Sequence, residues 1–262
     1  MQDSNQLANK EESREKLISF FSLLKSTWQF YHHRFLDFTE MYIWGLFGAI
    51  PLLIIGLIIL GFSFLGLDSA LLRFIFVILI ILALLYFLYY SIRAHIGIIL
   101  LIKNEKAKVK PIFIETKKFF RSYLNASVNV GIYIFFLTIL FIIPGIIFYI
   151  YWFFTTLLVV LEEIKKPMEA IKRSKNLVKG YWWAVAGRLI LIFFIYLIVL
   201  SIIMLPAAIN IDPVTKIETF KYLSQDLGQV YQILANLIGA LLSPILVVFS
   251  YFLYKDILAK KK

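Results

Sequence analysis

The chain has 262 residues, of which 61% are hydrophobic and 16% charged, with a formal net charge of +11 and a mean hydropathy of +0.85. A soluble domain usually has about 45–50% apolar and about 25% charged residues, so a globule of this composition would lack the polar surface that water requires. The composition excludes an ordinary soluble enzyme, a disordered protein and a secreted disulfide scaffold. The absence of cysteine further excludes thiolate metal sites and thiol nucleophiles. We therefore predict an all-α, polytopic integral membrane protein.

The first 16 residues form a polar arm of mixed charge. This arm lacks the apolar core and the small-residue cleavage site of a signal peptide, so we expect it to be retained and the first span to direct insertion. A turn around Gly66 separates the first two apolar stretches, and the polar stretch Asn210–Asp226 separates the last two. Five stretches reach the roughly 20 residues that cross a bilayer: Tyr42–Leu65, Ala70–Ile92, Ser122–Leu161, Gly187–Leu205 and Val230–Tyr254.

The stretch Ser122–Leu161 is long enough for two spans and is interrupted by Pro144-Gly145. If this pair forms a turn between two spans, all but three of the 27 Lys and Arg residues lie on one side of the membrane; a single kinked helix would divide them almost equally. The positive-inside rule favours the first arrangement. The sequence thus predicts six transmembrane helices in a plasma membrane, with both termini in the cytoplasm.

Three segments on the predicted cytoplasmic side have apolar residues spaced by three or four, with basic residues between them, as interfacial helices do. Pro167 suits the start of the third segment and Gly180 its end. We interpret the pattern as a single membrane domain, 1–262, with three copies of an interfacial helix followed by a transmembrane hairpin, at 17–105, 106–166 and 167–262. Each helix could contact lipid or pack as a lid on the bundle, and both alternatives stay open at this point. The apolar faces are Leu17, Phe20, Phe21, Leu24, Trp28, Tyr31 and Phe35; Ile112, Phe113, Thr116, Phe119, Phe120 and Tyr123; and Ala170, Ile171, Ser174, Leu177 and Val178.

The predicted spans hold no charged residue in their interiors, since Arg93 and Arg188 fall near the span ends. The adjacent His32 and His33 point about 100° apart on a helix and do not converge on a metal, and no catalytic motif is present. We therefore expect no enzyme site, no metal and no cofactor. The polar residues within the spans either bond across helices, as is usual, or line a solute path: Asn129, Thr138, Thr155, Thr156, Ser201, Asn236 and Ser243.

The stretch 142–189, IIPGIIFYIYWFFTTLLVVLEEIKKPMEAIKRSKNLVKGYWWAVAGRL, resembles the membrane domain found beside bacterial glycerophosphoryl diester phosphodiesterases and related uncharacterised six-helix membrane proteins. The resemblance covers these central residues well and the rest loosely. It implies a six-helix fold without catalytic residues, because the chemistry of those phosphodiesterases belongs to a separate soluble barrel. It also implies structural roles for the matching residues Pro144, Gly145, Glu162, Ser174 and Gly180.

These observations predict a non-catalytic membrane module that contacts anionic lipid or a partner membrane protein, and no nucleic acid. A transporter or channel for a small solute is the alternative. A lipid-modifying enzyme ranks third, because no nucleophile and base can be named. The residues expected to face lipid or a partner lie on and just after the third amphipathic helix: Lys172, Arg173, Lys175, Lys179, Trp182 and Trp183.

Overall fold

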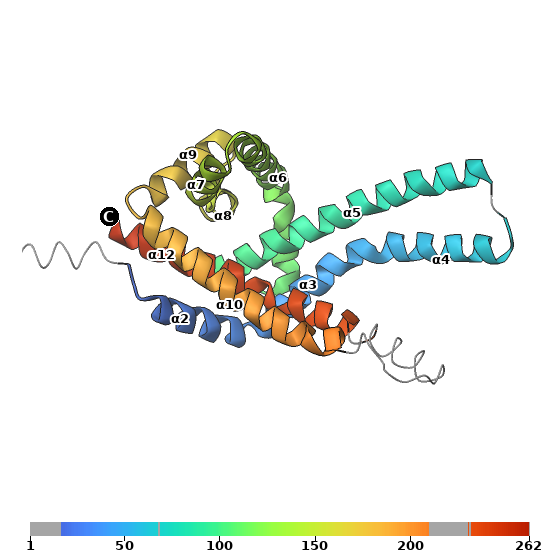
Figure 1. Cartoon of the computed structure of the whole chain (residues 1–262), viewed down its shortest axis with the longest axis horizontal. Helices are drawn as coiled ribbons and strands as arrows, with labels where there is room; N and C mark the ends of the chain where they lie inside the picture. The colour runs from blue at the N-terminus through green and yellow to red at the C-terminus, as the bar shows by residue number, and fades with distance from the viewer. Residues whose placement is uncertain (1–16, 68, 210–229, 231, 262) are drawn as a thin grey trace, which may run out of the picture. The chain divides into compact units, whose positions relative to one another are not determined.

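Figure 1 shows the computed structural model of the chain, which describes residues 17–67, 69–209, 230 and 232–261. All regular structure in these residues is helical. The chain divides into two compact units, one of residues 32–176 and the other of the residues up to Tyr31 together with those from Leu177 onward. As predicted, six helical segments among the described residues are long and apolar enough to cross a membrane: Phe35–Phe64, Ala70–Lys103, Val109–Leu140, Ile142–Leu161, Trp182–Ile203 and Gln232–Lys260.

The unit of residues 32–176 begins with a hairpin of two long apolar helices. Its first arm consists of α3 (Phe35–Leu46), the short 3-10 turn η1 (Phe47–Ala49) and α4 (Ile50–Phe64), and its second arm is α5 (Ala70–Lys103). Gly66 adopts the left-handed conformation with φ +66°, which glycine takes without steric cost. The hydroxyl of the N-cap Ser69 then accepts a hydrogen bond from the Leu72 amide at 3.3 Å. The predicted turn is thus confirmed, although both arms are longer than the predicted spans.

The next hairpin is confirmed as two helical segments, but its turn is not where the sequence analysis placed it. Helix α6 (Val109–Leu140) ends at Phe141, whose extended backbone (φ −155°, ψ 115°) joins it to α7 (Ile142–Trp152). Pro144 lies in the first turn of α7, where no hydrogen bond within the helix needs the N–H that proline lacks. If α6 continued as a helix through Pro144, the proline ring would clash with the carbonyl of Leu140, four residues earlier. The proline therefore forces the break, but the break falls three residues before it.

Gly145 allows α7 to fold back closely onto α6. A Cβ atom added at this glycine would collide with the side chain of Thr138. Helix α7 is followed by a short interruption and by α8 (Thr155–Leu161), which also packs on α6. Pro144 thus ends α6, and Gly145 allows α6 and α7 to pack closely.

Helix α9 spans Pro167–Val178, so it begins at the predicted proline. Gly180 follows with φ +94°, a left-handed conformation typical of the residue just past a helix. The Tyr181 amide then donates to the Val178 carbonyl at 2.9 Å. Both predicted ends of this helix are confirmed.

The unit that contains the two chain ends consists of α2 (Phe20–His33), α10 (Trp182–Ile209), helical residues 232–242 and α12 (Pro244–Lys260). Helix α2 lies along α12 through two pairs of rings, Phe20 with Phe249 and Phe30 with Phe252. The Tyr31 hydroxyl donates to the Leu241 carbonyl at 2.8 Å. One face of this amphipathic helix is therefore occupied by protein.

The predicted three-fold repeat stays a prediction. The first and third amphipathic segments are separate helices, α2 and α9, whereas residues 112–123 form the first half of α6 and continue into the span without a break. The arm 1–16 and the whole predicted polar stretch before the last span lie outside the described residues.

Candidate functional site

The third amphipathic helix is the region to which the sequence analysis assigned function, and the structure buries its apolar face. Ala170, Ile171, Leu177 and Val178 are all at most 6% exposed. The lysines between them, Lys172 and Lys175, are exposed. Protein therefore covers the face that could otherwise have entered lipid, which favours a packed lid over a helix that inserts into the membrane.

Ser174 is the polar residue on that buried face, and it holds α9 to the interruption between α7 and α8. Its hydroxyl donates to the Tyr151 carbonyl at 2.8 Å and accepts from the Phe154 amide at 3.2 Å. A break in a helix frees such backbone groups, which are costly to bury without a partner. Ser174, which is 0% exposed, thus replaces hydrogen bonds that the helix has lost.

Glu162 and Arg173 form a two-pronged ion pair on the same surface. The Arg173 Nε donates to Glu162 Oε2 at 2.9 Å and its Nη2 donates to Oε1 at 3.0 Å. This parallel geometry is the strongest that arginine and a carboxylate adopt. Arg173 therefore fixes α9 against the end of α8.

Glu163 is the next residue and has φ +55°, a left-handed conformation that is unusual for a residue with a side chain. Its carboxylate accepts hydrogen bonds from the Lys118 ammonium at 2.8 Å and the Lys103 ammonium at 3.4 Å. The bond and charge of Lys118, followed by those of Lys103, lower the pKa of Glu163 below its ordinary value. This exposed cluster connects the α8–α9 loop to α5 and α6.

Two tryptophans begin α10. The rings of Trp182 and Trp183 meet edge to face with centroids 4.6 Å apart, and Trp183 is 82% exposed. An exposed indole at the start of an apolar helix is typical of the membrane–water interface. Lys179, just before them, is also exposed.

Sequence reasoning missed two buried arginines in residues 32–176. Arg34 is 5% exposed and pairs with Asp37 at 2.7 Å. It also donates to the carbonyl of Leu101 at the end of α5 and to those of Asn104 and Ala107 just after it. The spacing of Arg34 and Asp37, three residues apart on a helix, indicates an ion pair between them. The further bonds of Arg34 go to carbonyls about 70 residues later, which local spacing does not indicate.

Arg93 is 4% exposed and lies inside α5, not at a span end as the shorter predicted span suggested. Its guanidinium donates to the Phe113 carbonyl at 2.6 Å and to the Thr116 hydroxyl at 3.0 Å. Its central carbon lies 4.1 Å from the centre of the Phe113 ring. Arg93 thus joins α5 to the first half of α6.

The polar span residues of residues 32–176 have different surroundings. Thr155 and Thr156 line a cavity of about 360 Å³ with Ser127 of α6, and the Thr155 hydroxyl has no hydrogen-bond partner among the described residues. The Asn129 amide instead donates to the carbonyl of Asn125 in its own helix at 2.8 Å.

The six apolar helices define a multi-pass integral membrane protein. Among the described residues, no three His, Asp or Glu side chains are grouped as a metal site would require. Comparisons of the chain with models of protein families, with curated proteins and with solved structures find no match.

Proposed function

We propose that this protein is a non-catalytic membrane module that gathers anionic lipid head groups along a basic rim. The rim comprises the exposed cations at the first half of α6, in the α8–α9 loop and on α9. Each cation close to an anionic leaflet contributes about 1 kcal/mol before screening by salt. Its members are Lys110, Lys117, Arg121, Lys165, Lys166, Lys172 and Lys175.

The observation that carries this proposal is that α9 is fixed by its buried face while its lysines remain exposed. Ser174 and the Glu162–Arg173 pair hold the helix in place. Because the backbone of α9 is already fixed, lipid binding does not have to order it, and less conformational entropy is lost on binding. The rim therefore suits lasting lipid contact better than a flexible basic tail would.

The proposal includes an orientation with the rim in the cytoplasmic leaflet of the plasma membrane, which the distribution of cations along the sequence supports. Because the chain has no cysteine, single cysteines can report the side. On intact cells we expect an impermeant maleimide to label Lys216→Cys, but not Ser26→Cys or Lys175→Cys. Labelling of Lys175→Cys would reverse the orientation of the rim.

The lipid contact can be tested by replacing three rim lysines on and just before α9, Lys166, Lys172 and Lys175, with glutamine; this is the α9 variant. Arg173 is left unchanged because its two hydrogen bonds to Glu162 help to fix α9. The control replaces Lys25, Lys255 and Lys260 with glutamine, which removes the same charge from α2 and α12. Anionic lipid retained after purification from mixed-lipid membranes is measured by mass spectrometry at low and high salt.

We expect the α9 variant to retain several-fold less anionic lipid than wild type at low salt, and the control variant to retain nearly as much as wild type. If both variants lost the same amount of anionic lipid, retention would depend on the total charge of the protein and not on the rim. Unchanged retention in the α9 variant would leave a partner membrane protein as the ligand of this surface.

A further inference from the structure

A second region of residues 32–176 has the features of a binding site, and it shares no residue with the basic rim. A cavity of about 270 Å³ lies between α3 and α5. Its lining residues follow helical spacing, so each helix contributes one face. They are Tyr42, Gly45 and Leu46 of α3, and Phe87, Ser91, Ala94, His95 and Ile98 of α5.

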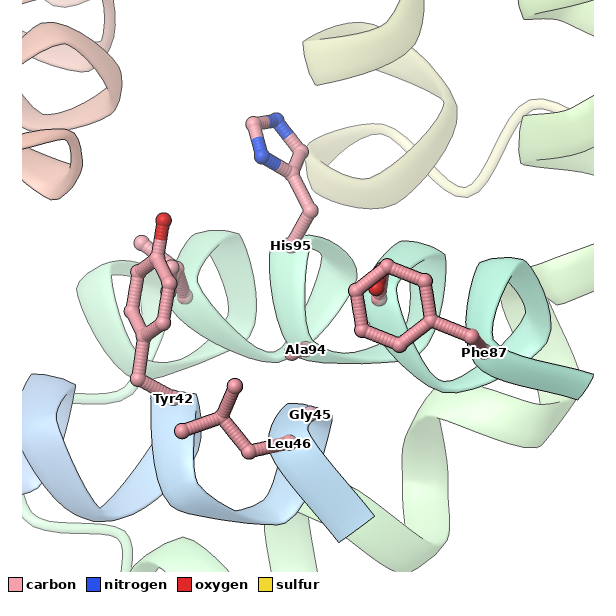
Figure 2. A pocket seen from close by; sticks show the side chains of 8 residues that line it. Tyr42, Gly45, Leu46, Phe87, Ala94 and His95 are labelled. Carbon is pink, nitrogen blue, oxygen red and sulfur yellow. The ribbon is translucent and has the colours of Figure 1, made fainter. Parts of the chain in front are cut away.

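Small residues create the cavity by bringing the two helices together at its floor. A Cβ atom added at Gly45 would lie 2.9 Å from the Cβ of Ala94, so no larger residue fits there without a shift. Larger side chains then stand around this floor. Figure 2 shows the rings of Tyr42 and His95 rising on the same side of the helix pair, with Phe87 further along α5.

The cavity contains hydrogen-bonding groups that the described protein does not use. Neither Ser91 nor His95 has a hydrogen-bond partner in the part of the chain that the structure describes; His95 makes a ring contact with Tyr123 at 5.9 Å between centroids. A neutral imidazole offers one donor and one acceptor, and a hydroxyl offers both. None of the lining residues is acidic, and none is Lys or Arg.

The position of the cavity along α5 places it near the membrane interface. A helix of 34 residues is about 51 Å long, whereas the hydrocarbon core is roughly 30 Å thick. His95 is eight residues from the end of α5, or about 12 Å. Its level therefore corresponds to the polar and ester groups of lipids rather than to the middle of their chains.

Leu46 and Phe87 are the lining residues nearest along the chain to the tip of the α4–α5 hairpin, whose surface is apolar and exposed. Leu53, Leu84 and Leu88 on this hairpin are between 49% and 68% exposed. A molecule whose polar end occupied the cavity could lay its apolar chains along this surface. The volume is below the about 300–1,000 Å³ of pockets that enclose a whole drug-sized ligand, so it suits a head group.

We propose that this cavity binds the glycerol head of an uncharged membrane lipid of the diacylglycerol class. The free hydroxyl and ester carbonyls of such a lipid match the hydroxyl of Ser91 and the imidazole of His95. A phosphate-bearing head group would call for Arg or Lys, its usual partners, and none lines the cavity. The site does not depend on the proposed function of the basic rim.

The test uses the full-length protein in phosphatidylcholine nanodiscs that contain a clickable diacylglycerol with a diazirine near its head. After irradiation, labelling is quantified and the labelled peptides are identified by mass spectrometry. The variant Ser91→Ala/His95→Phe is compared with the control Thr39→Val/His33→Phe. The control also removes one hydroxyl and one imidazole, from residues that do not line the cavity.

In the wild type we expect labelling of peptides that contain residues 42–46 and 87–98, and its displacement by unlabelled diacylglycerol. The cavity variant should be labelled about tenfold less, the effect of losing two hydrogen bonds, while the control matches wild type. Equal labelling of the two variants, or wild-type labelling confined to other peptides, would overturn the site. Stronger displacement by unlabelled phosphatidic acid than by diacylglycerol would overturn the assignment to an uncharged head group.

If the double variant fails to fold, Ser91→Ala alone is the decisive variant. It removes one hydroxyl without a partner and leaves every described hydrogen bond intact. We then expect labelling to fall about threefold, the effect of one weak hydrogen bond. Unchanged labelling would overturn the role of Ser91.

Discussion

The α4–α5 hairpin and the layer beside it differ in what covers their apolar side chains. Helix α4 has no buried residue, and Leu53 and Leu57 are 68% and 69% exposed. In the layer formed by α3, the end of α5, the start of α6 and α8, residues such as Phe38, Leu101 and Leu158 are at most 1% exposed. The hairpin depends on lipid as its solvent, whereas the layer is packed as the interior of a soluble protein is.

Buried polar groups follow the same division. Arg34, Arg93, Thr116 and Ser174 are all buried in residues 32–176, and hydrogen bonds connect each of them to the layer or its neighbours. The described residues of α4 include no charged side chain. From this comparison we expect substitutions in the layer to lower the free energy of unfolding strongly and substitutions on the hairpin to change it little. The following variants test this expectation, with the free energy of unfolding measured in bicelles.

The largest effect is expected for Arg34→Met. The change removes the donors to three carbonyls at and just after the end of α5 and leaves Asp37 without its cation. Asp37 itself is 39% exposed, so the main cost is the loss of the bonds to the carbonyls. Each hydrogen bond to a charged group contributes about 1.5–3 kcal/mol, and the loss of three gives the largest effect of the series. The exposed Arg121 provides the control, since Arg121→Met should change stability by less than about 0.5 kcal/mol. Similar results for both would show that Arg34 does not hold the layer together.

A matched pair of leucines tests the comparison directly. Leu158→Ala should cost about 2–5 kcal/mol because it leaves a cavity among packed side chains. Leu57→Ala leaves no cavity, since lipid refills the space, and we expect about 0.5 kcal/mol or less. If the two variants lose equal stability, the hairpin is covered by protein in the membrane and the comparison is wrong.

Ser174→Ala should have an intermediate effect. It leaves the Phe154 amide without its acceptor and the Tyr151 carbonyl without its donor, at a cost of about 1–3 kcal/mol. Ser201→Ala removes an exposed hydroxyl from α10 and serves as the control. Faster hydrogen exchange at the Phe154 amide would locate the effect at the α7–α8 interruption; unchanged exchange would argue against the role of Ser174.

The smallest effect is expected for Glu163→Gln, and it is best seen through pH. Since Lys118 and Lys103 lower the pKa of Glu163, its ionised form contributes stability above the pKa of the unfolded chain. That contribution is lost as the pH falls through the folded pKa. The difference in stability between wild type and variant should therefore be small at pH 7 and should vanish in acid; a difference that persists below the folded pKa would exclude the lysine pairs as its cause.

The sequence by itself determined the features that depend on hydropathy or on the local backbone. Five apolar stretches follow from length, because an unbroken helix is the simplest way to satisfy the backbone in hydrocarbon. The distribution of Lys and Arg then divides one of these stretches into two spans. The turn at Gly66 and the ends of α9 at Pro167 and Gly180 follow from the conformations that glycine and proline allow. Each of these glycine and proline signals lies within a few residues of the feature it predicts.

Only the tertiary structure decided where the polar groups find partners. Ser174 bonds to residues about 20 positions earlier, and Arg34 to carbonyls about 70 positions later. The close approach of α7 to α6 depends on Gly145 meeting Thr138 across the two helices. The cavity beside His95 required Gly45 to meet Ala94 across two helices. A sequence shows which groups need partners, but which groups meet is decided when helices distant in sequence pack together.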